Sequence, residues 1–230
     1  MNNILALETA TSSCSAALRV NGEIVERAQV GSNVHSQVLL AMVQELLASA
    51  SISPQQLDAV AVGQGPGSFT GLRIGVGVGQ GLAYGSDCPM IGVSSLAALA
   101  LAAPEEGVVL AGIDARMGEI YWGEYQKDQS TVKQLGSLKV TAPDLLSNEL
   151  TPDIQGGRQL VGNAWSEYWN KFAVEFKQTN VPCKHIVFPS AANLLVLAEQ
   201  KFERQEVESA IEFRPIYVRN NVAKKSSKNR

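Results

Sequence analysis

The chain has 230 residues, of which 45% are hydrophobic and 18% are charged, a composition typical of a folded globular protein rather than a disordered or fibrous one. Its formal net charge is −3, but residues 219–230 hold five of the 19 basic groups and no acidic one, so the rest of the chain carries −8. An acidic body is a poor surface for nucleic acid unless a partner supplies the positive field, so direct binding of nucleic acid by the body is not expected.

Cysteine spacing and the N-terminal sequence predict a cytoplasmic protein without a membrane span. Cys14, Cys88 and Cys183 are odd in number and widely spaced, which is typical of a reducing compartment. The N-terminus has no basic segment followed by an apolar core and a cleavage site, so no signal peptide is expected. Residues 74–104 contain a single charged side chain, Asp87, but turn residues interrupt the apolar run, which favours packing over a membrane span.

The N-terminus predicts an antiparallel meander. Residues 3–8, 14–20 and 23–30 have the composition of strands, and Asn21 and Gly22 form a strong two-residue hairpin signal between the last two. A short polar connection separates the first two strands. The chain is therefore expected to begin with three neighbouring strands of one sheet.

Helices and strands alternate after the meander. Residues 35–50 predict a helix, because apolar side chains recur there at helical spacing. Residues 58–63 and 90–93 predict buried strands, and residues 95–103 predict a second helix. Together with the meander, this order predicts an α/β fold with a mixed sheet.

A glycine-rich helix is expected between the two buried strands, beginning at Ser68 or Thr70. Each interior glycine costs a helix about 1 kcal/mol relative to alanine, so close approach of another backbone has to compensate. The glycines form two stripes, each with a spacing of four: Gly71, Gly75 and Gly79, and Gly77, Gly81 and Gly85. The pattern predicts a helix built for tight packing, with a polar loop at its N-terminal end.

A composition break at residues 104–107 divides the chain into two lobes, residues 1–104 and 105–218. The end of the second segment is expected to be able to pack back on the first lobe. Residues 219–230 predict a disordered basic tail.

The second lobe has fewer clear signals than the first. Residues 108–113 and 119–126 predict a hairpin, and residues 131–140 predict a third strand. Residues 190–204 predict a helix capped by Ser190, whereas the secondary structure of residues 141–189 is not assigned.

The loop of residues 65–68 is a candidate anion site, since glycine-rich loops at helix starts bind phosphate. A Walker-type loop ends in Gly-Lys-Ser/Thr, whereas Gly71 is followed by Leu72 and Arg73, and the dinucleotide fingerprint also fails. Tight packing and phosphate binding both stay open from the residues alone. No metal site is expected, because neither His35 nor His185 has a further ligand at suitable spacing.

Two acidic residues, Glu8 and Asp114, end the first strand of each lobe. In a two-lobed fold they can face one cleft, where a kinase-like enzyme keeps its acids. They can equally cap turns through hydrogen bonds from backbone amides. Neither a metal pair nor a nucleophile beside a base is visible, so no catalytic residue is assigned.

Four segments together resemble the TsaB (YeaZ) family: ILALETAT at residues 4–11, His35-Ser36, GPGSFTGLRIG at residues 65–75, and Asp114-Ala115-Arg116. The likeness is close over residues 1–126, and PIYVR at residues 215–219 fits the family's ending. It implies a two-lobed actin/Hsp70/sugar-kinase-like (ASKHA) fold, in which each lobe is a mixed sheet with helices. It also implies a non-catalytic partner of the TsaD subunit in forming threonylcarbamoyladenosine next to the anticodon of tRNAs, assisted by the ATPase TsaE.

The resemblance also implies that this chain alone binds no cofactor, with ATP and metal held by partner subunits. The histidine pair that binds metal in TsaD corresponds to Ser95 and Leu99, which cannot replace it. Nucleotide-binding members of the superfamily have glycine after the first acid of each hairpin, where this chain has Thr9 and Ala115. If a nucleotide binds, the candidate residues are Glu8, Thr9, Gly67, Ser68 and Asp114.

By the same resemblance, the partner surface is formed by the helices at residues 35–50 and 70–85, and the isolated chain forms a homodimer through it. The expected contact residues are Leu39, Met42, Val43, Leu46, Leu72, Gly75, Val76, Gly79 and Leu82. One glycine stripe is expected to face the chain's own sheet and the other a second subunit. Contact with tRNA is expected to be indirect. The alternative function is a small-molecule kinase or ATPase that uses Glu8 and Asp114 in the cleft between the lobes.

Overall fold

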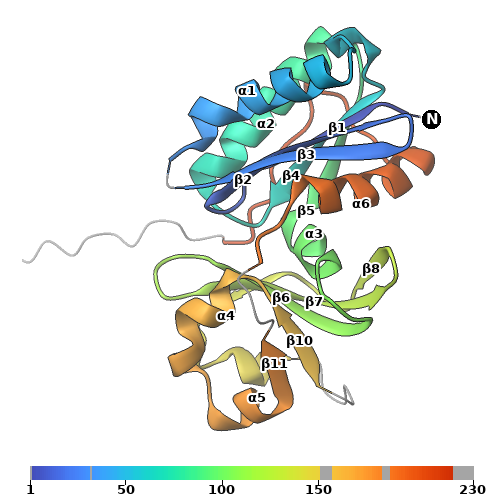
Figure 1. The fold of residues 1–230 in the computed structure, drawn as a ribbon. Coiled ribbons are helices and arrows are strands. Elements are labelled where there is room, and N and C mark those ends of the chain that lie inside the picture. Colours follow the sequence, from blue (N-terminus) through green and yellow to red (C-terminus); the bar gives the residue numbers. More distant parts are fainter. Residues whose placement is uncertain (1, 32, 151–156, 183–186, 220–230) are drawn as a thin grey trace, which may run out of the picture.

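A computed structural model describes residues 2–31, 33–150, 157–182 and 187–219. It has two lobes, each built on a mixed sheet with helices, and Figure 1 shows one lobe above the other. The predicted two-lobed α/β fold is therefore confirmed. Along the described residues, no helix has the length and the apolar run needed to cross a bilayer.

The sheet of the first lobe has the strand order β3-β2-β1-β4-β5. Its strands are β1 (Ile4–Glu8), β2 (Ser13–Val20), β3 (Glu23–Val30), β4 (Ala59–Gly65) and β5 (Met90–Ser94). The first three are antiparallel, as the Asn21-Gly22 turn predicts, and β1, β4 and β5 run parallel. Parallel pairing places the carboxyl ends of β1 and β4 at one edge of the sheet, next to the other lobe.

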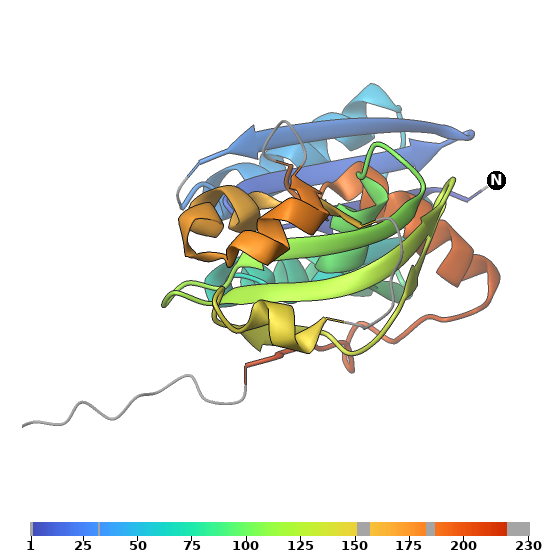
Figure 2. The same cartoon turned by 90° about the horizontal axis from the view of Figure 1, so that it is seen from below.

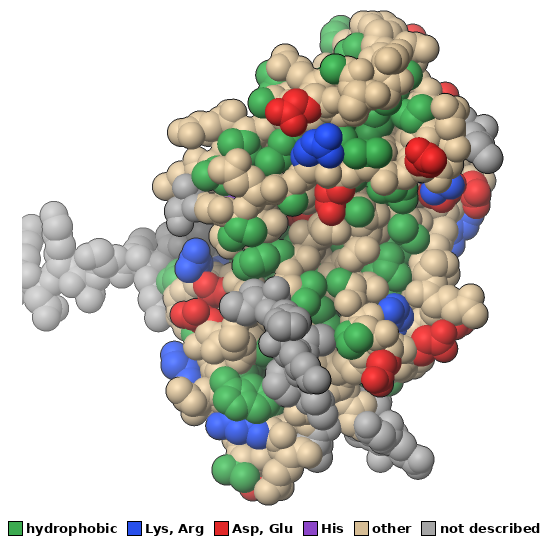
Figure 3. All heavy atoms as spheres, in the orientation of Figure 1, with side chains coloured by type: hydrophobic (Ala, Val, Ile, Leu, Met, Phe, Trp, Pro, Cys, Tyr) green, Lys and Arg blue, Asp and Glu red, His purple; other side chains and the backbone are tan. Residues whose placement is uncertain are grey.

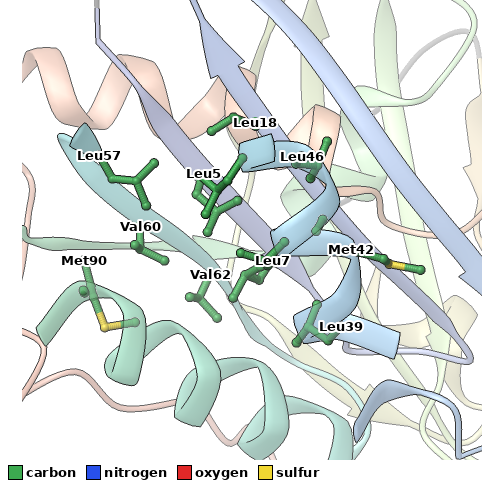
Figure 4. Packing of buried hydrophobic residues seen from close by; sticks show 14 of the residues in the cluster. Leu5, Leu7, Leu18, Leu39, Met42, Leu46, Leu57, Val60, Val62 and Met90 are labelled. Atoms are coloured by element: carbon green, nitrogen blue, oxygen red, sulfur yellow. The ribbon is translucent and has the colours of Figure 1, made fainter. Parts of the chain in front are cut away.

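Helices cover both faces of this sheet because its central strands are apolar on both sides. Side chains alternate along β1, so that Leu5 and Leu7 point to one face and Ile4 and Ala6 to the other. Two helices, α1 (His35–Ser49) and α2 (Phe69–Gly85), cover the first face, and α6 (Ala191–Glu203) covers the second. Figure 4 shows the first core, in which leucines of α1 meet Leu5, Leu7 and the β4 valines.

The sheet of the second lobe has the order β11-β10-β6-β7-β8, and β9 also pairs with β7. Its strands are β6 (Gly107–Asp114), β7 (Ile120–Asp128), β8 (Thr131–Gln134), β9 (Lys139–Thr141), β10 (Arg158–Val161) and β11 (Asn180–Pro182). Figure 2 shows the long β6–β7 hairpin crossing the lower lobe, with helices on one side of it. Those helices are α4 (Asn163–Tyr168) and α5 (Val174–Thr179). Short 3₁₀ turns span Pro54–Gln56, Leu146–Glu149 and Trp169–Lys171.

The third strand predicted over residues 131–140 is wrong as a single element. The structure divides it into β8 and β9: the last contact of the first part with β7 is the hydrogen bond from the amide of Leu135 to the carbonyl of Glu124 at 2.9 Å, and exposed Gly136 follows it. A glycine inside a strand pattern often marks such a break.

The two lobes meet along α3 (Ser95–Leu101), a short helix that belongs to both cores. Leu96, Leu99 and Ala100 pack in one cluster with strand residues of the second sheet. Leu99 and Ser95 are completely buried: Leu99 packs between the lobes, and Ser95 lies beside Glu8 of the first lobe.

The chain returns to the first lobe after the second sheet. Both α6 and residues 207–219 lie against the first lobe, so the second lobe is shorter than the predicted segment 105–218. Phe213 is fully buried in the core under α1 and α2. Arg219, predicted as the start of a disordered tail, has an ion pair with Glu119 at 2.5 Å, and the remaining residues of that prediction lie outside the described part of the chain.

Phe213→Ala is expected to lower the free energy of unfolding by about 3–5 kcal/mol, because it empties a buried site in the first core. Ile211→Ala is the matched control in the same segment; its side chain is 69% exposed, and its effect should stay within about 0.5 kcal/mol. Urea unfolding monitored by circular dichroism measures both. Equal effects would show that the chain end does not belong to the core.

Candidate functional site

The loop between β4 and α2 is fixed by contacts with the connection between β1 and β2. The Ser68 side chain caps α2 by accepting a hydrogen bond from the amide of Gly71 at 3.2 Å. The amide of Ser68 donates to the carbonyl of Ala10 at 2.7 Å, and a Cβ at Gly67 would collide with that carbonyl. The loop is thus packed against its own lobe, which was one of the two readings that the sequence left open.

The first glycine stripe of α2 lies directly on the sheet. A Cβ at Gly71 or Gly75 would collide with the carbonyl or the hydroxyl of Thr9. A Cβ at Gly79 would lie 2.6 Å from a methyl group of Val62. The backbone of α2 therefore lies directly against Thr9 and Val62 with no room for a side chain, as the spacing of these glycines predicts.

The second glycine stripe is open. Gly77, Gly81 and Gly85 are exposed, and a Cβ built at any of them would have no neighbour within 4 Å. Ile74, Val78 and Leu82 flank this stripe and are only partly buried against the core. Nothing within the described first lobe explains why three exposed helix positions should lack a side chain.

The structure corrects the predicted set of partner-contact residues. Eight of the nine, Leu39, Met42, Val43, Leu46, Leu72, Gly75, Val76 and Gly79, are buried within the chain's own lobe, and the ninth, Leu82, is partly buried. Helical periodicity selects the stripe that faces the core, and a partner reaches only the opposite stripe.

The exposed face of α1 and α2 is the surface that a partner can reach. The two helices lie side by side on one face of the sheet (Figure 1), so their solvent-facing sides point the same way. We call this surface the docking face: Leu40, Ala41, Gln44 and Ala48 of α1, and Gly77, Val78, Gly81, Leu82, Tyr84 and Gly85 of α2. Leu40 is 50% and Tyr84 73% exposed. The sequence predicted Leu82 as a contact residue and assigned one of the two glycine stripes to a second subunit, but it missed the exposed side chains of Leu40, Val78 and Tyr84.

A cleft of about 780 Å³ lies between the lobes. It is lined by residues 10–12, 66–72 and 113–117 together with the chain end at residues 216–219. Of the predicted nucleotide set, Gly67, Ser68 and Asp114 line this cleft. Glu8 and Thr9 do not, because both are completely buried beneath it, so their assignment to a nucleotide site is wrong.

Asp114 caps the turn that follows β6. Its Oδ1 accepts hydrogen bonds from the amide of Arg116 and from the hydroxyl of Tyr168, each at 2.8 Å, and its Oδ2 lies 3.1 Å from the Arg116 guanidinium. Burial and the hydrogen bond to Asp114 raise the pKa of Tyr168 to about 12, so this phenol stays a donor. Both oxygens of Asp114 are thus engaged by its own lobe.

Glu8 caps the equivalent turn after β1. Its Oε1 accepts a hydrogen bond from the amide of Ala10 at 2.7 Å, and its carboxyl group lies beside the Ser95 hydroxyl and so close to Gly63 that a Cβ there would collide with Oε2. Complete burial raises the pKa of this carboxyl above its usual range, although the amide hydrogen bonds oppose the effect. The two acids therefore do not meet in the cleft, and both act as turn caps.

His35 holds the connection between β1 and β2 to the start of α1. Its Nε2 lies 2.9 Å from the carbonyl of Thr11, and the side chain is buried. His185 lies outside the described residues. Within the described ranges, no group of three His, Cys, Asp or Glu side chains is close enough to hold a metal ion.

Figure 3 shows basic and acidic side chains interspersed on one face of the molecule, without a broad area of one sign. Such a surface lacks the basic patch that marks binding of a nucleic-acid backbone.

Comparison with known proteins places the chain near one group of relatives. A protein-family model described as "TsaD: tRNA N6-adenosine threonylcarbamoyltransferase" matches residues 28–227. The "tRNA threonylcarbamoyladenosine biosynthesis protein TsaB" of Escherichia coli K12 is 37% identical over 225 residues, which cover 96% of each chain. The protein of the same name from Haemophilus influenzae is also 37% identical, over 95% of this chain and 94% of its own.

A solved structure supports the same grouping. YeaZ from Pseudomonas aeruginosa superposes with a TM-score of 0.86 at 37% sequence identity, covering 94% of this chain and 100% of the other. The two-lobed fold and the sequence thus agree over nearly the whole chain.

Glu8→Gln is expected to reduce the pH dependence of stability. The pKa of Glu8 is higher in the folded protein than in the unfolded chain. At pH values between the two pKa values, the folded protein keeps a proton that the unfolded chain has lost, so wild-type stability falls as pH rises through this range. The amide cannot ionise, so this loss disappears in the variant. Urea unfolding measures this effect when it is followed from pH 4.5, the ordinary pKa of a glutamate, upward. Parallel stability curves for both proteins would contradict a raised pKa.

Gly79→Ala and Gly81→Ala are expected to have opposite effects. The first forces a methyl group against Val62 and should destabilise the fold by about 1–3 kcal/mol. The second adds a methyl group in open space and should stabilise it by about 0.5–1 kcal/mol through helix propensity. Urea unfolding compares the pair, and a destabilising Gly81→Ala would show that the second stripe is not free.

Proposed function

This chain belongs to the TsaB (YeaZ) family, and we propose that it acts in tRNA threonylcarbamoyladenosine biosynthesis as a non-catalytic docking subunit. Its partner is a TsaD-like catalytic paralogue, which it holds in an active form. The full-length similarity to proteins named for this pathway supports the pathway, and the exposed glycine stripe of α2 supports the docking role.

The second glycine stripe carries the proposal. Two of these glycines, Gly77 and Gly81, lie inside α2 and weaken it by about 1 kcal/mol each relative to alanine, and the described residues make no contact that would use their missing side chains. A partner helix gains from them, because bare positions let two helix backbones approach closely. Leu40, Val78 and Leu82 supply apolar area beside the stripe. In the absence of the paralogue, the same face serves a homodimer, in which one patch meets its copy across a two-fold axis.

The cleft supports a docking subunit better than an enzyme. A kinase or ATPase would need free acids there, whereas Glu8 is buried away from the cleft and Asp114 is bound by Arg116 and Tyr168. We therefore propose that ATP and metal are held by the partner subunits, among them a TsaE-like ATPase. On this proposal the chain meets tRNA only through the complex and works in the cytoplasm.

Gly81→Glu tests the docking face. A glutamate there keeps or improves helix propensity but places an unpaired charge in the interface, so affinity for the paralogue should fall by about 100-fold. Isothermal titration with purified TsaD-like protein measures the affinity, and reconstituted tRNA modification should fall with it. Positions 75 and 79 are unsuitable for this test, because a charge there would disrupt the fold itself.

Gly136→Glu is the matched control, since Gly136 is also exposed with open space around it but lies in the second lobe. It should bind and support modification like the wild type. If Gly81→Glu also does so, the docking face is wrong. If the isolated wild-type chain binds ATP with magnesium at micromolar affinity, the kinase or ATPase alternative regains support.

A further inference from the structure

Residues 207–219, which we call the clasp, run from the first lobe across the mouth of the cleft to the second. At one end, Glu208 pairs with Met90 at the edge of β5 through backbone hydrogen bonds of 2.8 and 2.9 Å. Phe213 anchors the middle, because its side chain is completely buried in the first core. At the other end, Arg219 reaches the β6–β7 hairpin of the second lobe.

The clasp is bound along its length to α2 and the end of β4. The Gln80 side chain donates to the carbonyls of Ala210 and Phe213 at 2.7 and 3.2 Å. The amide of Ile216 donates to the carbonyl of Gln64 at 2.8 Å. The position of the clasp therefore depends on the position of α2.

Two aromatic rings continue this contact at the rim of the cleft. The rings of Phe69 and Tyr217 lie 5.7 Å apart, and the Arg73 Nε donates to the Tyr217 hydroxyl at 3.3 Å. The Arg73 guanidinium also lies 3.7 Å from the centre of the Phe69 ring. The start of α2 and the end of the clasp thus form one unit.

Arg219 binds a strained turn in the second lobe. Its Nη2 lies 2.5 Å from a carboxylate oxygen of Glu119 and 3.5 Å from the carbonyl of Arg116, and its guanidinium lies over the Tyr121 ring. Arg116 and Met117 both have left-handed backbone angles, with φ of 61° and 57°. Consecutive residues in this region persist only where the surroundings hold them. Arg219 supplies part of that support from outside the lobe, and its side chain is only 13% exposed.

We propose that the clasp fixes the separation of the two lobes across the cleft and couples it to the position of α2. Arg219 is the positioning residue at one end and Gln80 the positioning residue at the other. A displacement of α2 along or away from the sheet moves the clasp and changes the contacts of Arg219 with the β6–β7 turn. This device is a property of the isolated chain and does not depend on the proposed docking function.

Arg219→Ala tests the lobe-fixing step. Backbone amides of residues 115–119 should exchange with deuterium about fivefold faster, because the turn loses its ion pair and its carbonyl contact with the largely buried Arg219 side chain. Spin labels on Ser36→Cys and Glu167→Cys, exposed positions on opposite sides of the cleft, should give a broader distance distribution. The additional substitutions Cys88→Ser and Cys183→Ser remove native thiols that could also react with the spin label. Glu119→Gln should reproduce both effects.

Arg204→Ala is the matched control, since the contacts of the Arg204 side chain are local and exposed: an ion pair with Glu206 and a hydrogen bond to the carbonyl of Gln200, both before the clasp begins. It should leave exchange and label distances unchanged. Wild-type behaviour of Arg219→Ala in both measurements would overturn the proposal, and equal effects of the control would show that the changes are not specific to the clasp.

Gln80→Ala tests the coupling step. Gln80 contacts the clasp from α2, and its hydrogen bonds to the clasp involve residues before Arg214. If the clasp acts as one unit, this variant should also accelerate exchange at residues 115–119. If Arg219→Ala accelerates amide exchange at residues 115–119 but Gln80→Ala does not, the coupling to α2 is wrong. The clasp would then stabilise only the β6–β7 turn.

Discussion

The close contact between α2 and the sheet of the first lobe is the constraint on which the other features depend. Gly71, Gly75 and Gly79 let the helix backbone rest on Thr9 and Val62, where any side chain would collide. A helix held at that depth has its first turn fixed as well, with Ser68 capping it and Gly67 pressed on Ala10. This contact determines three other features: the wall of the cleft, the buried site of Phe213 and the outward direction of the second glycine stripe.

The same contact separates two kinds of glycine on one helix. Those of the first stripe are required by the fold, because nothing larger fits against the sheet. Those of the second stripe have open space beside them in the described chain, and Gly77 and Gly81 lower helix stability, which is why we propose a partner helix as their use. Natural sequences violate local propensity mainly where function demands it.

Sequence reasoning was most successful where local signals and the fold agree. The Asn21-Gly22 turn, the apolar strands and the glycine spacing predicted the first lobe nearly element by element. It failed on α1 in one respect: Leu39, Met42, Val43 and Leu46 were assigned to a partner, although an apolar stripe marks the face that the chain buries itself. The sequence allowed for a chain end that packs back on the first lobe, but the individual contacts of the clasp were not predictable, because an extended segment has no periodicity. Its contacts join residues about 100 positions apart or more, such as Arg219 with Glu119.

Glu8 and Asp114 show why a motif position does not define a chemical role. Each acid ends the first strand of its lobe and accepts a hydrogen bond from the amide two residues later. A carboxylate used in this way is directed back into its own turn. In Asp114 the second oxygen is taken by Arg116, and in Glu8 burial favours the neutral form. The lobes thus retain the turn geometry of a two-lobed cleft, while both carboxyl groups serve to hold the backbone. A chain with this arrangement can keep a defined cleft shape without presenting free acids to a substrate, which agrees with the docking role that we propose for it.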